Sequence, residues 1–446
     1  AVYEADSFDI KYTGGYTFYD YDLYSDADGT AIESITYNAI TGIAPITACQ
    51  PALAARGAPV GTLTGAAAGC QTAFAPRTIY PNVLNIYEES RSLFSNEINF
   101  ISTTDGPLQW IAGIYQYQEN SDKPGQQQFP AHEPLAGAYL DPVPGMVANP
   151  DRTLQTFRNV SLFNAYGVYG QADYSFNDQW KVTAGLRWSK DVKESKEEAF
   201  LACYIICEGS ITPALAVPYF NYTRTAYGGI TGPNAPTFDS RGWAVRRLNG
   251  SWDAVTGMLG VEYRPLDDTL LFAKYSRGYK AGGFNNLGMG AEPYTDPESV
   301  DAYEGGWKQE WADWGLTTNA AVFHYKYNDM QAPLTVITGQ QGETGSTSFT
   351  AFINVPEAES TGFELEGNWS PIDPLNIGFT YAYLNAEVSN TNGERYVDVS
   401  QDPGSVVGGV IVRPEGPTRR QDVTGNKLAQ SPEHKVAINA SYRFDF

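Results

Sequence analysis

Apolar and polar residues alternate with a period of two along several separate stretches of the chain. In the stretch 180–188 the even positions are apolar, whereas the odd positions are polar or glycine. Stretches 363–369, 375–383 and 436–446 show the same alternation. Successive side chains of a β-strand point to opposite faces, so this pattern predicts strands that each have one apolar and one polar face.

Short and long connections alternate between the expected strands. The short ones are rich in Asp, Asn, Gly and Pro, which suits tight turns: 103–107, 176–179, 265–268, 312–314 and 370–374. The long ones are 25–89, 120–156, 193–249, 281–297, 328–349 and 389–431. We count about twelve strands, many of them longer than the five or six residues usual in globular proteins.

Long loops at one end and short turns at the other are typical of a barrel that spans an outer membrane. We therefore predict an all-β fold, an antiparallel transmembrane β-barrel whose apolar positions face lipid. The alternative is a soluble β-sandwich or propeller. Five polar residues on the opposite parity are expected to face a wet interior, where they line a pathway or hydrogen-bond one another: Arg187, Glu364, Glu366, Asn376 and Arg443.

The amino-acid composition is consistent with a β-strand protein, and the net charge argues against nucleic acid as a partner. The chain holds 30 Tyr and 44 Gly among 446 residues, and its mean hydropathy is −0.34. No run approaches the roughly 18 apolar residues of a membrane-spanning helix. The net charge of −22 opposes nucleic-acid binding, because phosphates would be repelled.

Four cysteines form two local pairs. Cys49 and Cys70 share one Ala/Gly/Pro-rich stretch, and Cys203 and Cys207 bracket three residues. We expect two disulfides in an oxidising compartment, with free thiols as the alternative. Neither pair has a nearby histidine, so we expect no metal site.

Several ordered segments resemble one family, the TonB-dependent receptors of Gram-negative outer membranes. The segments 95–100, 108–115, 168–174, 183–188, 297–308, 354–366 and 428–434 all resemble family strands. The most specific segment is 275–285, which begins after an apolar run and could by itself be read as a phosphate-binding loop. Its marker residues are Tyr275, Arg277, Gly278, Tyr279, Lys280, Gly282, Gly283, Phe284 and Asn285. Because glycines and prolines follow instead of a helix, we interpret this segment as a strand that bends over the barrel rim.

The resemblance also implies an incomplete domain. Family members carry a plug domain and a barrel of about 22 strands. We expect residues 1–446 to be a receptor-like β-barrel domain without its plug, and the rival interpretation is a self-closed small barrel that ends at Phe446.

The function that the resemblance implies is energy-coupled uptake of a scarce ligand across the outer membrane. That ligand would be an iron–siderophore, a vitamin or a glycan, and the partners would be outer-membrane lipid, the TonB energy-coupling protein and the small-molecule or chelate ligand itself. A passive porin and a soluble β-rich binding protein are the alternatives. Three scattered histidines and the lack of a nucleophile elbow predict no enzyme activity, and we expect no cofactor.

The long connection 193–249 is the expected ligand contributor. Guanidinium groups suit anionic ligands, and aromatic faces suit sugars or planar rings. The alternative is that the same side chains only pack the loop on its neighbours. The candidate ligand-binding residues are Tyr219, Tyr222, Arg241, Trp243, Arg246 and Arg247.

Overall fold

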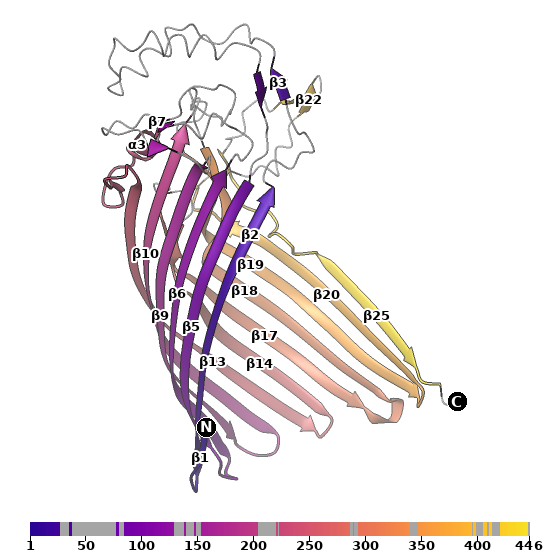
Figure 1. Cartoon of the computed structure of the whole chain (residues 1–446). Coiled ribbons are helices and arrows are strands. Elements are labelled where there is room, and N and C mark those ends of the chain that lie inside the picture. The colour runs from indigo at the N-terminus through magenta and orange to yellow at the C-terminus, as the bar shows by residue number, and fades with distance from the viewer. Residues whose placement is uncertain are drawn as a thin grey trace, which may run out of the picture.

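The chain forms one long antiparallel sheet that curves through space (Figure 1). The computed structural model describes residues 1–26, 35–37, 77–79, 84–128, 138–139, 147–148, 153–203, 220–221, 223–285, 289, 293–338, 347–394, 396–397, 405–407, 410–412 and 420–444. Twelve strands of nine or more residues build the sheet in these parts of the chain, as the alternation predicts. They are β2 (Phe8–Asp26), β5 (Leu84–Ser102), β6 (Leu108–Gln128), β9 (Thr153–Ser175), β10 (Trp180–Cys203), β13 (Ala244–Leu266), β14 (Thr269–Lys280), β17 (Glu298–Trp311), β18 (Leu316–Thr338), β19 (Thr347–Ile372), β20 (Leu375–Asn390) and β25 (His434–Tyr442).

Shorter elements complete the described chain. Beside the sheet edge lies β1 (Val2–Glu4), and one helix, α3 (Thr223–Tyr227), is described. No helix in the described residues is long and apolar enough to cross a membrane. The others are β3 (Ile35–Tyr37), β4 (Arg77–Ile79), β7 (Ala138–Tyr139), β8 (Val147–Ala148), β11 (Phe220–Asn221), β12 (Thr237–Phe238), β15 (Gly283–Phe284), β16 (Tyr294–Thr295), the 3-10 helix η4 (Ala312–Trp314), β21 (Tyr396–Val397), β22 (Ser405–Val407), β23 (Val410–Val412) and β24 (Arg420–Gln421).

Neighbouring long strands are consecutive in sequence, so the sheet is an up-and-down meander. The order runs β1-β2-β5-β6-β9-β10-β13-β14-β17-β18-β19-β20-β25. The connections 103–107, 176–179, 267–268, 312–315 and 373–374 all lie at one end, which we call the turn end (Figure 1). The other end, which we call the loop end, carries the long connections. This arrangement confirms the predicted alternation of short and long connections.

Each strand has an apolar and a polar face over its turn-end half. In β10 the exposed large side chains are Trp180, Leu186 and Trp188, all at even positions. Their partners on β13 include Tyr263 and Val255, which are also on the exposed apolar face. From Lys190 toward the loop end the same face carries charged residues. The apolar band of β10 is thus nine residues long, the length that crosses a bilayer as a tilted strand.

Aromatic side chains gather at the turn end of this apolar band. Trp180 stacks on Tyr263 with ring centroids 4.3 Å apart, and Trp311 stacks on Trp314 at 5.6 Å. Such girdles mark the interface between lipid and water. The apolar face with an aromatic border excludes the soluble sandwich, because a sandwich buries that face against a second sheet.

The strands continue well beyond the apolar band, which corrects several predicted loop boundaries. Residues 193–203 and 244–249 are strand in β10 and β13 rather than loop. Likewise β6, β9, β18 and β19 extend into the predicted connections 120–156 and 328–349. Both faces of a strand are polar above a membrane, so alternation disappears while the backbone ladder between β10 and β13 continues without a break to Ala199 and Ala244.

Buried apolar clusters occur only at the loop end among the described residues. One contains Ala199, Tyr227, Ala244 and Met289, and another contains Val355, Val388 and Val423. Within the same residues no ladder joins β25 to β1 or β2, and every residue of β25 is exposed. The long sheet, which we call the wall, is therefore stabilised by cross-strand pairing and by the apolar clusters at the loop end. In the described residues it has no sandwich core.

Candidate functional site

The polar face of the wall is the candidate functional surface, because the apolar face contacts lipid. Arg187, Glu364 and Glu366 lie on this polar face, since their chain neighbours Leu186 and Phe363 are on the exposed apolar face. The strand register places Asn376 on the same side, opposite Ser441 of β25. Arg443 follows β25 on the parity of Ser441, and its neighbour Phe444 is exposed on the apolar parity.

Arg187 lies at the centre of a polar cluster that joins four strands. Its guanidinium lies over the rings of Tyr115 at 5.6 Å and Tyr169 at 5.4 Å, and its Nε donates to Ser189 Oγ at 2.8 Å. The hydroxyl of Tyr169 lies within hydrogen-bond distance of the carboxylate of Glu97 and of the side-chain amide of Asn99. Arg187 is therefore held on the polar face by two aromatic rings and a hydroxyl group of the sheet.

A second polar cluster, which we call the upper polar cluster, lies on the polar face closer to the loop end. Arg91 pairs with Glu89 at 2.5 Å and with Glu119 at 3.5 Å. Lys123 approaches Glu89 at 3.5 Å, and the hydroxyl of Tyr87 donates to Glu89 at 3.0 Å. The other members are Tyr19, which donates to Glu89 at 3.3 Å, and Tyr117, which donates to Glu119 at 2.6 Å.

The electrostatics of the upper polar cluster favour ionised carboxylates and protonated tyrosines. Burial tends to raise the pKa of Glu89, but Tyr87, Lys123 and Arg91 together hold that pKa below its ordinary value. Burial and the hydrogen bond to Glu89 raise the pKa of Tyr87 to about 12. The cluster thus offers cations and phenol groups on one wet surface. This cluster was not predicted from the sequence, although the alternation of Tyr87, Glu89 and Arg91 on one parity was a usable signal.

The candidate ligand-binding residues of the connection 193–249 do not all lie together in the structure. Arg246 and Arg247 are neighbours on β13, so their side chains point to opposite faces. Arg246 is buried and its Nε pairs with Glu197 Oε2 at 2.5 Å, whereas Arg247 is exposed on the opposite side. Burial raises the pKa of the Glu197 carboxyl, although Arg246 opposes that shift. The expectation that Arg246 and Arg247 belong to a long loop was therefore wrong, because both belong to strand β13.

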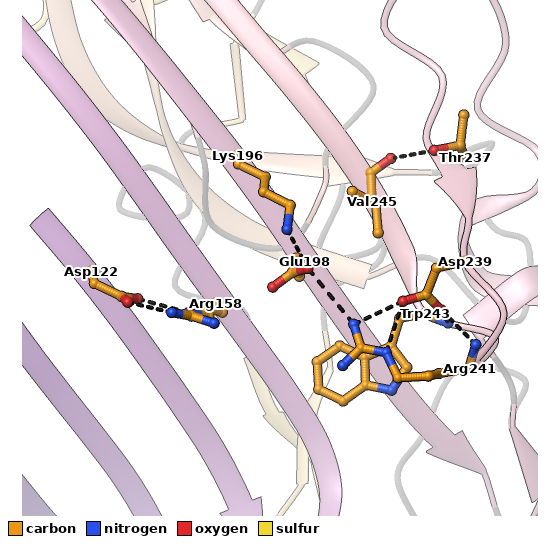
Figure 2. A network of polar contacts seen from close by, with 9 residues as sticks. All are labelled: Asp122, Arg158, Lys196, Glu198, Thr237, Asp239, Arg241, Trp243 and Val245. Carbon is orange, nitrogen blue, oxygen red and sulfur yellow. Dashed lines mark hydrogen bonds and ion pairs between the residues drawn. The ribbon is translucent and has the colours of Figure 1, made fainter.

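Arg241 and Trp243 do lie together (Figure 2). The Arg241 guanidinium lies 4.6 Å from the Trp243 ring and pairs with Asp239 at 2.8 Å and Glu198 at 3.7 Å. Trp243 also packs on Phe200 at 5.7 Å. These contacts hold the β12–β13 turn against the wall. Tyr219 and Tyr222 lie outside the described residues.

The segment 275–285, the most specific match to the family, connects two short strands of the sheet to the taller strands on either side. Strands β14 and β17 have only 12 and 14 residues, and the taller β13 and β18–β19 flank them. Tyr275, Arg277, Gly278, Tyr279 and Lys280 belong to β14, which ends where the segment 281–297, the rim loop, begins. Tyr275 contacts Tyr303 at 5.1 Å on the apolar face, and its register partner on β13 is Leu259.

The rim loop is fixed on both sides. On one side, the hairpin residue Phe284 contacts Trp252 of β13 at 6.0 Å, and Lys193 Nζ of β10 donates to the carbonyl of Gly282 at 2.8 Å. Toward β19, Asn285 donates to the carbonyl of Phe352 at 2.8 Å and accepts from its N–H. A Cβ on Gly282 would lie 2.5 Å from the Thr295 carbonyl oxygen, so glycine is required there. The remaining marker residue, Gly283, pairs with Thr295 in the β15–β16 hairpin.

Metal ligands and disulfides receive little support from the described residues. Among them, no group of three His, Cys, Asp or Glu side chains could hold a metal ion. Cys49, Cys70 and Cys207 lie outside the described residues, and Cys203 ends β10 with a side chain that is not described. The two disulfides therefore stay predictions.

Comparison with known proteins shows which family this chain resembles. The family model described as "TonB dependent receptor-like, beta-barrel" matches residues 2–446. The metal-pseudopaline receptor of Pseudomonas aeruginosa is 30% identical over 304 residues, which is 67% of this chain and 35% of that receptor. The pesticin receptor of Yersinia enterocolitica is 32% identical over 167 residues, which is 36% of this chain and 23% of that receptor.

Solved structures show the same fold at low sequence identity. The ferric yersiniabactin uptake receptor of Yersinia pestis superposes with a TM-score of 0.57 at 13% identity, over 100% of this chain and 46% of that protein. A siderophore receptor from Acinetobacter baumannii gives a TM-score of 0.52 at 16% identity, over 98% of this chain and 50% of that protein. The chain thus spans half or less of the length of each relative.

Proposed function

Because the chain belongs to the TonB-dependent receptor-like β-barrel family, we propose that it forms the wall of an outer-membrane receptor for energy-coupled uptake of a metal chelate. The observation that carries this proposal is the family match along residues 2–446, together with an apolar band that suits the bacterial outer membrane. A passive porin and a soluble binding protein are the less favoured alternatives, since neither belongs to this family.

The proposed ligand class rests on the polar face and on the relatives. The names of the relatives include metal, siderophore and pesticin receptors. Arg91 and Lys123 on the polar face provide cationic donors, and Tyr19 and Tyr87 provide hydroxyls beside them. Carboxylate, catecholate and hydroxamate chelates present oxygens of partial or full negative charge, which such donors bind well.

The geometry of the wall supports a separate proposed role for each group of residues. Ligand passes along the polar face, where the Arg187 cluster and the upper polar cluster provide hydrogen-bonding groups at two heights. Energy comes from the TonB coupling protein, as the family resemblance implies. Arg241, Trp243 and Arg247 lie on the outer face of the sheet, so they remain proposed ligand contacts only for a ligand that approaches from that side. Arg246 has a structural role, because it pairs with Glu197 on the polar face.

The test is metal uptake by cells that carry the full-length protein as their single copy of this receptor. A panel of ferric chelates, radiolabelled on iron, would identify a ligand whose uptake disappears when the gene is deleted and when the proton-motive force is dissipated. Uptake that survives dissipation would identify a passive channel instead. Replacing Arg91 and Lys123 with glutamine should then raise the half-saturating ligand concentration, whereas Arg264→Gln at the turn end should leave it unchanged.

A further inference from the structure

Lys193 anchors part of the rim loop to the polar face of β10. Its Nζ donates to the carbonyl of Gly282 at 2.8 Å. We call residues 281–285 and 293–297 of this loop the rim hairpin, because they contain β15 and β16. The ammonium group belongs to β10 and the carbonyl to the segment after β14, so this single bond joins residues that are 89 positions apart in the sequence.

In the part of the chain that the structure describes, the Lys193 ammonium has aromatic neighbours but no carboxylate within ion-pair distance. Its Nζ lies 5.0 Å from the ring centroid of Phe163 and 5.7 Å from that of Trp252, on the two adjacent strands. Burial lowers the pKa of this ammonium group, although the carboxylates of Asp191 and Glu119 oppose that shift. Because a desolvated cation gains more from a negative charge than a solvated one does, the position of the ammonium depends on the charges nearby.

Glu119 brings such a charge from the upper polar cluster. The strand register places Glu119, Phe163 and Lys193 in one row across β6, β9 and β10. Two strand spacings put the Cα atoms of Glu119 and Lys193 about 10 Å apart, which the two long side chains together can span. Glu119 is held on its own side of this row, because it accepts from Tyr117 at 2.6 Å and pairs with Arg91 at 3.5 Å. Arg91 and Lys193 are therefore competitors for one carboxylate.

The rim hairpin has a second anchor that does not involve β10. Asn285 exchanges two hydrogen bonds with the backbone of Phe352 on β19. The N–H of Asn285 donates to the Pro293 carbonyl at 2.6 Å, and the N–H of Asp296 donates to Asn354 Oδ1 at 2.8 Å. The hairpin can therefore lose its bond to β10 and stay attached to β19, and these two amides report on that change.

We propose that Lys193 is a positioning residue that transmits a change of charge at Arg91 to the rim hairpin. When an anion binds Arg91, Glu119 loses that partner and attracts the Lys193 ammonium, which leaves the Gly282 carbonyl. The hairpin is then held by β19 alone. The anion is the chelate of the proposed function, so the ligand in this inference rests on that function, whereas the link between Arg91 and the hairpin does not.

Hydrogen exchange of the full-length receptor in detergent, without any ligand, tests the anchor. The readout is the exchange rate of the Asn285 and Asp296 amides. We expect Lys193→Met to exchange about tenfold faster, the size of one lost charge-assisted hydrogen bond, and Lys193→Arg to retain most of the protection. The matched control is Lys190→Met, which removes an exposed lysine from the opposite face of the same strand and should leave both rates unchanged.

A second set of variants tests the link to the upper polar cluster. Arg91→Gln imitates the bound anion, because it removes the cation that holds Glu119, and it should speed exchange of the two hairpin amides about as much as Lys193→Met does. Adding Glu119→Gln should restore the original rates, since a neutral amide does not attract the ammonium. In Lys193→Met, Arg91→Gln should add nothing. A purely structural loss at Arg91 would not be rescued by the second substitution.

The rates of the paired amides of β5 and β6 show whether each variant keeps its fold. Original hairpin rates in Lys193→Met would overturn the proposal, and so would fast exchange in Arg91→Gln that persists when Glu119 is also replaced. Failure of the uptake experiment would not alter any of these rates, so the failure of the proposed function and the failure of this inference are distinguishable.

Discussion

Arg246 and Glu197 form an ion pair between β13 and β10 in which each side chain is only 2% exposed and the Nε–Oε2 distance is 2.5 Å. The pair lies on the polar face beyond the membrane band, where Tyr227 of α3 packs against Ala199 and Ala244 and β12 pairs with the end of β13. A buried pair of this kind makes each partner strongly dependent on the other.

Removing one partner of this pair should destabilise the loop end of the wall. Arg246→Met leaves the Glu197 carboxylate buried without its counterion, and we expect a loss of about 3–5 kcal/mol in unfolding free energy. The double variant Arg246→Met with Glu197→Leu should recover most of that loss. Denaturant titration of the full-length receptor in detergent measures both values, and Arg241→Met, at an exposed ion pair, should lose less than about 1 kcal/mol.

The contact between Asp122 and Arg158 should create an acid-dependent step in stability. The hydrogen bond from Arg158 holds the pKa of Asp122 below its ordinary value of 3.8, outweighing the effect of burial. The stabilisation is therefore complete above the pKa of the unfolded chain and is lost as the pH falls through the lower folded value. Hydrogen exchange of β6 and β9 between pH 6 and pH 2 should show this step, and Asp122→Asn should abolish it. A step of equal size in the variant would assign it to another group.

A methyl group at Gly282 should release the rim loop. Gly282→Ala places a Cβ 2.5 Å from both the Thr295 carbonyl oxygen and the Trp252 ring, and relief of that overlap costs about 1–3 kcal/mol. We expect faster hydrogen exchange and faster proteolysis at residues 281–297, with membrane insertion unchanged. Gly229→Ala is the control, because nothing lies within 4 Å of its added Cβ. Equal protection of the rim loop in both variants would contradict the conclusion that the close contacts at Gly282 hold this loop.

The two faces of β13 should respond differently to an introduced charge. Leu259 is 57% exposed at the middle of the apolar band, so Leu259→Arg should cost about 2–4 kcal/mol in lipid. Met258 lies on the polar face of the same strand, opposite Gly185 and Ser276, and Met258→Arg should cost far less. Heat-modifiable migration of outer-membrane fractions, read as the melting temperature of the folded band, compares the two. Similar losses would mean that both faces are wet.

Local sequence patterns determined the strands and turns that depend on nearest neighbours. Period-two alternation located the membrane-crossing part of β10 and β20, and turn-forming residues gave the connections 103–107 and 176–179 with the bounds that the structure has. Turn chemistry and side-chain parity act over a few residues, so they can be read without knowing what lies across the sheet. The same parity placed Arg187 and Glu364 on the polar face.

Tertiary structure decided what depends on partners distant in sequence. Above the membrane both faces of β10 and β13 are polar, so only the ladder between them shows that Arg246 and Arg247 belong to a strand and point apart. The upper polar cluster likewise combines β2, β5 and β6, whose residues meet because of register. Register is a property of strand pairs, and a single sequence contains its alternation but not the identity of the residue on the opposite strand.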